Sequence, residues 1–89
     1  MTVCKRVLYS GRVQGVGFRY TVQRLAERLT AAGYVRNLAC GDVELVAEGD
    51  EEDVDDLLRR VADVMSDHIR HAAVSNQTPQ GLSGFEIVH

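Results

Sequence analysis

The spacing of apolar residues alternates along this 89-residue chain between two periods, and the alternation restricts the fold more than any other feature. A period of two residues is typical of strands, and a period of about 3.6 residues is typical of helices. The strand-like segments are residues 5–10, 34–38, 43–48 and 69–74, with a further apolar segment at 85–88. The helix-like segments are residues 18–30 and 51–65. We therefore expect the order βαββαβ, followed by one more strand.

This order predicts an α+β fold of the ferredoxin-like type. In that sandwich, an antiparallel-rich sheet carries two helices on one face. Residues 1–89 suffice for a single domain of this kind and leave no room for a second hydrophobic core.

The composition is that of an ordinary soluble protein, with 45% hydrophobic and 26% charged residues. No apolar run approaches the roughly 18 residues that cross a membrane, and the first residues lack the apolar stretch of a secretory signal. The two cysteines, Cys4 and Cys40, have no metal-binding spacing, so we expect reduced thiols and a cytoplasmic location. A net charge of −3 argues against a nucleic-acid partner.

Residues 11–19, Gly-Arg-Val-Gln-Gly-Val-Gly-Phe-Arg, connect the first strand to the first helix. Gly15 and Gly17 can adopt positive φ angles and allow an oxygen-rich ligand to approach the backbone. N–H groups at the start of a helix have no partner within the helix, and the helix dipole favours an anion there. Arg19, in the first turn, can hold a phosphate with two parallel hydrogen bonds. The loop therefore indicates an anion site, although similar glycine loops also occur without a ligand.

The loop matches none of the common phosphate-binding motifs. It lacks the Gly-Lys-Ser/Thr ending of a nucleotide P-loop, and Tyr20 stands in place of the third glycine of the dinucleotide motif. Neither Cys4 nor Cys40 is followed six residues later by the arginine of a cysteine phosphatase loop. Any phosphate chemistry here is expected to proceed without a covalent cysteine or a nucleotide.

The expected fold brings Asn37 to the same end of the sheet as this loop. A right-handed helical crossover joins the strand at 5–10 to the strand at 34–38, so the two run in the same direction. Taken singly, Asn37 fits a hairpin residue bonded to its own backbone, and Arg19 fits a solvated charge on a helix. Their joint placement beside the loop favours a functional site instead. Arg36 alternates with Asn37 along its strand and is expected to be a surface charge.

The candidate site holds an arginine, an amide and backbone donors, but no acid or base. The three histidines lie outside both segments, and we expect them to be solvated: His68, His71 and His89. A carboxylate can leave without a proton because its conjugate acid has a pKa of roughly 4–5, whereas the alkoxide of a phosphate monoester needs one. These residues favour a mixed anhydride as the substrate. No residues have metal-ligand spacing, so we expect no metal.

Several segments together resemble the acylphosphatase family. Residues 11–19 are similar to the phosphate loop of that family, and residues 34–37, Tyr-Val-Arg-Asn, to its second strand. Residues 43–49 are similar to its third strand and residues 85–87 to its last, so the resemblance covers nearly the whole chain. The chain departs from the family pattern at four positions outside the candidate site: Thr30, Tyr34, Cys40 and His89.

The resemblance implies hydrolysis of acyl phosphates to a carboxylate and inorganic phosphate, without a cofactor. It implies that Arg19 and Asn37 are catalytic and that Asn37 positions the attacking water. It further implies that the phosphoryl group is bound by Gln14, Gly15, Val16, Gly17, Phe18 and Arg19. For Gln14 we expect the backbone N–H, rather than the side chain, to matter. We also expect the protein to be a monomer. Inorganic phosphate, as a product, is expected to act as a competitive inhibitor.

A binding module without turnover is the main alternative, because the same sandwich also forms RNA-binding and ligand-sensing domains. An RNA-binding surface would need exposed aromatic residues and a basic sheet face, whereas residues 43–48 are acidic and contain no aromatic residue. A module that senses phosphate or an acyl phosphate is the alternative that these observations leave open.

Overall fold

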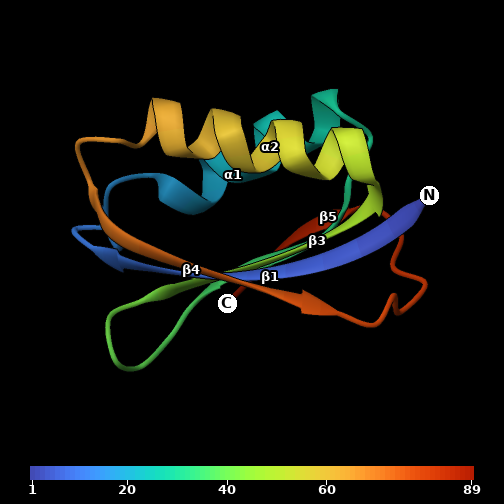
Figure 1. Ribbon diagram of the computed structural model, residues 1–89. Helices are drawn as coiled ribbons and strands as arrows, with labels where there is room; N and C mark the ends of the chain where they lie inside the picture. The colour runs from blue at the N-terminus through green and yellow to red at the C-terminus, as the bar shows by residue number, and fades with distance from the viewer.

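A computed structural model describes residues 1–89 as a five-stranded sheet with both helices on one face (Figure 1). The strands are β1 (Thr2–Gly11), β2 (Ala32–Asn37), β3 (Val43–Asp50), β4 (Ile69–Gln77) and β5 (Phe85–Val88). The helices are α1 (Phe18–Arg28) and α2 (Glu51–Val64). Neither has the length and apolar composition that crossing a membrane requires. The predicted fold class and order of elements are confirmed.

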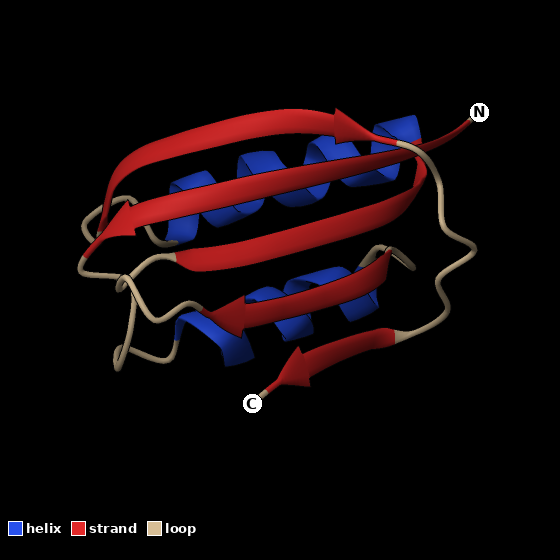
Figure 2. Ribbon diagram, turned by 90° about the horizontal axis from the view of Figure 1, so that it is seen from below, coloured by secondary structure: helices blue, strands red, loops and turns tan.

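The sheet has the order β4-β1-β3-β2-β5, which can be followed in Figure 2. β3 pairs antiparallel with β1 on one side and with β2 on the other, and β1 also pairs antiparallel with β4. β1 and β2 therefore run in the same direction, as a right-handed crossover predicts. Only β2 and β5 are paired in parallel. The C-terminal ends of β1 and β2 consequently lie at the same end of the sheet.

The hydrophobic core lies between the sheet and the two helices and contains 16 buried residues. The helices contribute buried residues at three- and four-residue intervals: Phe18, Val22 and Ala26 from α1, and Val54, Leu57 and Val61 from α2. Each fully buried Val, Leu or Phe side chain stabilises the fold by roughly 1.5–3 kcal/mol. This packing holds the first turn of α1 against the sheet, beside the end of β2.

The ends of several elements differ from the sequence prediction. β1 begins at Thr2 rather than at residue 5, because Thr2 pairs with Asp50 at the end of β3. β4 continues to Gln77 rather than residue 74, because its last residues pair with β1. α1 ends at Arg28, and Thr30, predicted to be helical, has a positive φ of 53°. Strand pairing and turn geometry decide where these elements end, and the spacing of apolar residues does not predict either.

Glu44 is buried on the face of the sheet that lies away from the helices, since it alternates with the core residues Val43 and Leu45. Its carboxylate accepts hydrogen bonds from Nε of Arg6 at 2.5 Å and from Nε of Arg36 at 2.6 Å. Burial by itself raises the pKa of Glu44, but the two guanidinium groups outweigh it and the pKa is lowered. Arg36 is exposed, as predicted, but the sequence did not indicate that its guanidinium pairs with a buried carboxylate.

Glu48 is also buried and fixes the connection between β4 and β5. Its carboxylate accepts hydrogen bonds from the backbone N–H of Gln80 at 2.5 Å and from that of Leu82 at 2.9 Å. These bonds lower the pKa of Glu48, although burial opposes them. The connection is thereby held against β3.

Both cysteines are free, as predicted: Cys4 is buried and Cys40 is exposed. Burial, followed by the nearby charge of Glu48, raises the pKa of the Cys4 thiol. Cys4 is therefore expected to react slowly with thiol reagents in the folded protein.

We expect Glu44→Gln to lower the free energy of unfolding at pH 7 by about 1–3 kcal/mol, because two arginines then lack their carboxylate. The pKa of Glu44 is lowered in the folded state. Its contribution is therefore fully present above the ordinary glutamate pKa of about 4.3 and is lost as the pH falls through the lowered value.

Urea unfolding at pH 7 and pH 3 measures this effect, and the deficit of the variant should shrink at pH 3. Glu86→Gln, at an exposed position of β5, is the control and should change stability little at either pH. An equal deficit of Glu44→Gln at both pH values would contradict the ion-pair account.

Candidate functional site

The connection from β1 to α1 meets the last residue of β2 at the end of the sheet that the topology predicts. A cavity of about 210 Å³ lies there, lined by Val13, Gly15, Gly17, Phe18, Arg19, Tyr20 and Asn37. Five of the seven residues proposed for the site from the sequence are among these lining residues: Gly15, Gly17, Phe18, Arg19 and Asn37. The fold therefore brings the glycine loop and the asparagine together.

The backbone of the loop leaves its N–H groups available to a ligand. Gly15 and Gly17 have φ angles of 76° and 78°, in the left-handed region that glycine adopts without steric cost. Gly17 precedes α1, and no side chain caps the start of that helix. The N–H groups of the first turn thus have no partner within the helix and form the positive end of its dipole. An anion suits this position.

Buried side chains on both sides of the glycines hold the loop in place. Val13 is 0% exposed and Phe18 is 2% exposed. The ring of Phe18 packs against that of Tyr9, with ring centroids 5.1 Å apart. Burial raises the pKa of Tyr9, so its hydroxyl stays neutral beneath the site. Because its ring is in the core, Phe18 can offer a ligand only its backbone N–H.

Arg19 is the only cationic residue that lines the cavity. Its Nη1 lies 3.4 Å from the carbonyl oxygen of Val88 and 3.5 Å from Nδ1 of His89. Both distances are long for hydrogen bonds, and no ion pair of the structure includes Arg19. The positive charge of Arg19 is therefore not neutralised by a carboxylate and is available to an anion.

Asn37 places an unpartnered acceptor at the same cavity. It is the last residue of β2, and its backbone is held by pairing with Val43. Its side-chain oxygen, Oδ1, is buried and has no hydrogen-bond partner. A buried polar atom without a partner is rare in folded proteins and costs about 1–3 kcal/mol. This differs from the alternative of a hairpin asparagine whose oxygen is bonded to its own backbone.

Gln14 and Val16, the other two residues proposed for the site, do not line the cavity. Val16 is 38% exposed. The side chain of Gln14 reaches the β2–β3 hairpin, where its Nε2 donates to the carbonyl oxygens of Leu38 at 2.8 Å and Asp42 at 2.9 Å. The Gln14 side chain therefore contacts the hairpin rather than the cavity, and these contacts were not predicted.

Two residues that line the cavity were missed in the sequence. Tyr20 is 59% exposed and directly follows Arg19 in the first turn of α1. Its position next to Arg19 could have indicated that it lies at the site. Val13, a residue of the loop itself, also lines the cavity. None of the three histidines lines the cavity. No group of three or more His, Cys, Asp or Glu side chains is arranged to hold a metal ion.

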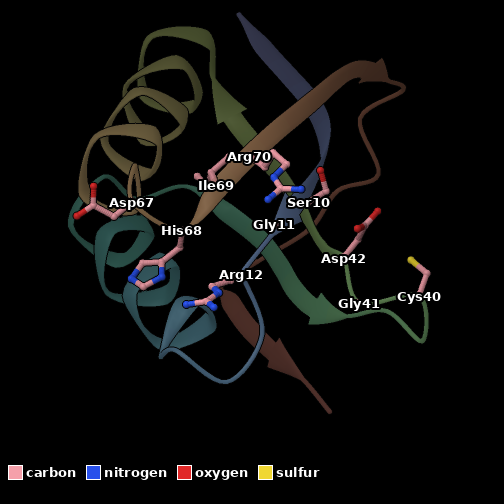
Figure 3. A pocket seen from close by; sticks show the side chains of 10 residues that line it. All are labelled: Ser10, Gly11, Arg12, Cys40, Gly41, Asp42, Asp67, His68, Ile69 and Arg70. Carbon is pink, nitrogen blue, oxygen red and sulfur yellow. The ribbon is translucent and has the colours of Figure 1, made fainter.

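A larger hollow of about 710 Å³ lies at the same end of the sheet, among the start of β4, the end of β1 and the β2–β3 hairpin (Figure 3). Its lining carries charges of both signs: Arg12, Arg70, Asp42 and Asp67. Figure 3 shows these side chains spread around the hollow rather than directed at one point. None of the residues proposed for the site lines it, so the smaller cavity is the better candidate despite its size.

The sequence is similar to proteins of one family. Residues 5–87 match the family model of acylphosphatases. The chain is 44% identical over 82 residues to an acylphosphatase of Nostoc sp., and the match covers 91% of this chain and 81% of the relative. It is 43% identical over 80 residues to an acylphosphatase of Thermococcus kodakarensis, with coverage of 88% and 87%.

Solved structures agree with the sequence matches. The crystal structure of acylphosphatase from Bacillus subtilis covers all of both chains with a TM-score of 0.89 at 34% identity. The structure of an acylphosphatase from Coxiella burnetii has a TM-score of 0.86 at 32% identity and covers 98% of this chain and 93% of that one. Because the family model, the identity over most of the chain and the fold all agree, the chain belongs to the acylphosphatase family.

Proposed function

We propose that this protein hydrolyses acyl phosphates to a carboxylate and inorganic phosphate, with Arg19 and Asn37 as the catalytic residues. One observation carries the proposal: an arginine without a counter-charge, a glycine loop at a helix start and the unpartnered oxygen of Asn37 share one small cavity. Membership of the acylphosphatase family supports the same reaction.

The phosphoryl group is bound by the loop and by Arg19. Donors come from the backbone N–H groups of residues 14–19, namely Gln14, Gly15, Val16, Gly17, Phe18 and Arg19. The planar guanidinium of Arg19 adds charge-assisted hydrogen bonds, which are about twice as strong as neutral ones. Phosphoryl transfer spreads charge over the phosphoryl oxygens in the transition state, so donors that are already in place lower the barrier.

Asn37 positions the attacking water. Its Oδ1 can accept a hydrogen bond from that water, and its Nδ2 can donate one. The water oxygen attacks phosphorus in line with the acyl oxygen, and the bond from phosphorus to that oxygen breaks with its electron pair leaving on the carboxylate. The water proton passes to a phosphoryl oxygen, because no carboxylate or histidine lines the cavity.

Because the cavity holds no general acid, the leaving group must be one that departs without a proton. A carboxylate leaves as the conjugate base of an acid with a pKa of roughly 4–5 and needs no proton. An alkyl phosphate would have to release an alkoxide and would need a general acid. The cavity residues thus favour acyl phosphates over monoesters, and they require no metal ion as an activator.

We propose further that the chain acts as a monomeric cytoplasmic enzyme formed by a single domain, without a nucleic-acid partner. The single core of 16 buried residues supports one domain. The two free cysteines suit a reducing compartment. The net charge of −3 does not suit a nucleic-acid surface.

Phosphate release from acetyl phosphate tests the proposed function, with glycerol 3-phosphate as the monoester control. We expect release from acetyl phosphate alone, unchanged by a chelator such as EDTA. Activity that is lost with EDTA and restored by a divalent ion would contradict the metal-free mechanism. Binding of acetyl phosphate without release would favour a sensing module instead.

Arg19→Ala should weaken the binding of both substrate and inorganic phosphate. Charge-assisted hydrogen bonds contribute roughly 1.5–3 kcal/mol each, so phosphate affinity should fall roughly 10-fold to 100-fold or more. Competitive inhibition by phosphate measures this loss. Arg19→Lys should restore little, because an ammonium group cannot reproduce the two parallel hydrogen bonds.

Arg24→Ala is the matched control for Arg19, since Arg24 is an exposed arginine of α1 that does not line the cavity. This variant should behave as the wild type. Unchanged phosphate inhibition in Arg19→Ala would show that the anion binds elsewhere.

Asn37→Ala should lower kcat by roughly 100-fold or more, the scale of a lost positioning group, while phosphate inhibition changes little. Thermal stability should not fall, because the variant removes a buried oxygen that has no partner. Asn37→Asp should also lower kcat, since a carboxylate repels the phosphoryl oxygens and lacks the N–H donor. Steady-state kinetics and thermal unfolding give these values. A kcat near that of the wild type in Asn37→Ala would remove the water-positioning role.

A further inference from the structure

The side chain of Gln14 joins the phosphate loop to the hairpin that follows Asn37. Its Nε2 donates to the carbonyl oxygen of Leu38 at 2.8 Å and to that of Asp42 at 2.9 Å. Leu38 directly follows Asn37. The carbonyls of Leu38 and Asp42 also accept the hydrogen bonds that close the hairpin. The oxygen of Asp42 accepts from the N–H of Leu38 at 2.8 Å, and the oxygen of Leu38 accepts from the N–H of Gly41 at 3.0 Å.

The chemistry of these partners fixes the orientation of the Gln14 amide. Both partners are carbonyl oxygens, which can only accept, so the NH₂ group must face them. With both hydrogens of the NH₂ group engaged, the amide cannot rotate without losing two bonds. The side chain is therefore a rigid connection between loop and hairpin.

No other hydrogen bond joins the loop to the hairpin. At its start, the N–H of Arg12 donates to the carbonyl oxygen of His68 at 2.9 Å. At its end, the N–H and hydroxyl groups of Thr21 donate to Gly17. Between these points, over residues 13–16, the two bonds of the Gln14 side chain are the only hydrogen bonds that the loop makes. The backbone N–H groups of the loop are thereby left free.

We propose that Gln14 is a positioning residue that sets the distance between the bound phosphoryl group and the amide of Asn37. The inference rests on the proposed function, because it assumes that the loop holds the phosphoryl group and that Asn37 holds the water. Loop and hairpin come from different parts of the chain, so their separation is fixed only where a contact joins them. The side chain of Gln14 acts through Asn37 and does not itself touch the reacting atoms, whereas its backbone N–H belongs to the proposed phosphate donors.

Loss of this connection should affect kcat more than binding. The loop keeps its own anchors without Gln14, because the side chains of Val13 and Phe18 remain in the core. The phosphate donors therefore stay in place, whereas the hairpin after Asn37 loses its contact with the loop, and the Asn37 side chain can shift relative to the donors. A displacement of about 1 Å in a catalytic geometry can cost roughly 100-fold in rate.

The test compares Gln14→Met, which keeps the length of the side chain without its donors, with Gln23→Met as the matched control. Gln23 makes an equivalent amide-to-carbonyl bond, from Nε2 to the oxygen of Phe85 at 3.2 Å, but it lies outside the cavity. We expect Gln14→Met to lower kcat roughly tenfold or more and to change phosphate inhibition less than about threefold. Gln23→Met should leave kcat unchanged when assayed well below its unfolding temperature.

A double-mutant cycle with Asn37 separates positioning from simple stabilisation. If Gln14 acts through Asn37, Gln14→Met should lower kcat by less than about twofold in the Asn37→Ala background. An undiminished effect in that background, or a loss of phosphate inhibition as large as the loss of kcat, would overturn the inference. Gln14→Asn, which keeps a donor on a shorter side chain, serves if Gln14→Met unfolds and should give a smaller fall in kcat.

The outcomes also separate this inference from the proposed function. A large effect of Asn37→Ala together with a wild-type kcat in Gln14→Met would remove the role of Gln14 and leave the function standing. A wild-type kcat in Asn37→Ala together with a large effect of Gln14→Met would show that Gln14 does not act through Asn37. No release of phosphate from acetyl phosphate by the wild type would overturn both.

Discussion

The antiparallel pairing of β3 with both β1 and β2 is the constraint on which the candidate site depends. Because β3 runs opposite to each neighbour, β1 and β2 finish at the same end of the sheet, and α1 begins beside the end of β2. The register is held by buried residues on one face of β3, including Val43 and Leu45, each 0% exposed. A slip by one residue would turn Glu44 into the core and separate it from Arg36, its partner across the strands.

The loop between β1 and α1 is held by side chains rather than by its own backbone. Val13 and Phe18 are in the core, and the amide of Gln14 bonds to the hairpin. A loop that folded on its own backbone hydrogen bonds would have used the N–H groups that an anion needs. Anchoring through side chains leaves those donors unpaired and still keeps the loop in one shape, which is what a preorganised anion site requires.

The order of elements and the start of α1 at Phe18 could be predicted because they follow from local periodicity. The meeting of Arg19 with Asn37 could also be predicted, because a helical crossover makes β1 and β2 run in the same direction and end at the same end of the sheet. The role of the Gln14 side chain could not, since its partners lie 24 and 28 residues away and depend on how the hairpin sits against the loop. Nor could the burial of Glu44, because its burial depends on arginines that neighbouring strands supply.

The buried polar side chains of the sheet either have hydrogen-bond partners or lack them, and the one that lacks a partner lies at the candidate site. Glu44 and Glu48 are buried with two donors each. The oxygen of Asn37 is the only buried side-chain polar atom left without a partner, and it lies at the same cavity as the unpaired charge of Arg19. A fold that satisfies its other buried polar groups gains no stability from this arrangement, so a purely structural role does not account for it. A water could donate a hydrogen bond to the oxygen of Asn37, and a phosphoryl group could accept hydrogen bonds from Arg19, so these two ligands would satisfy both groups.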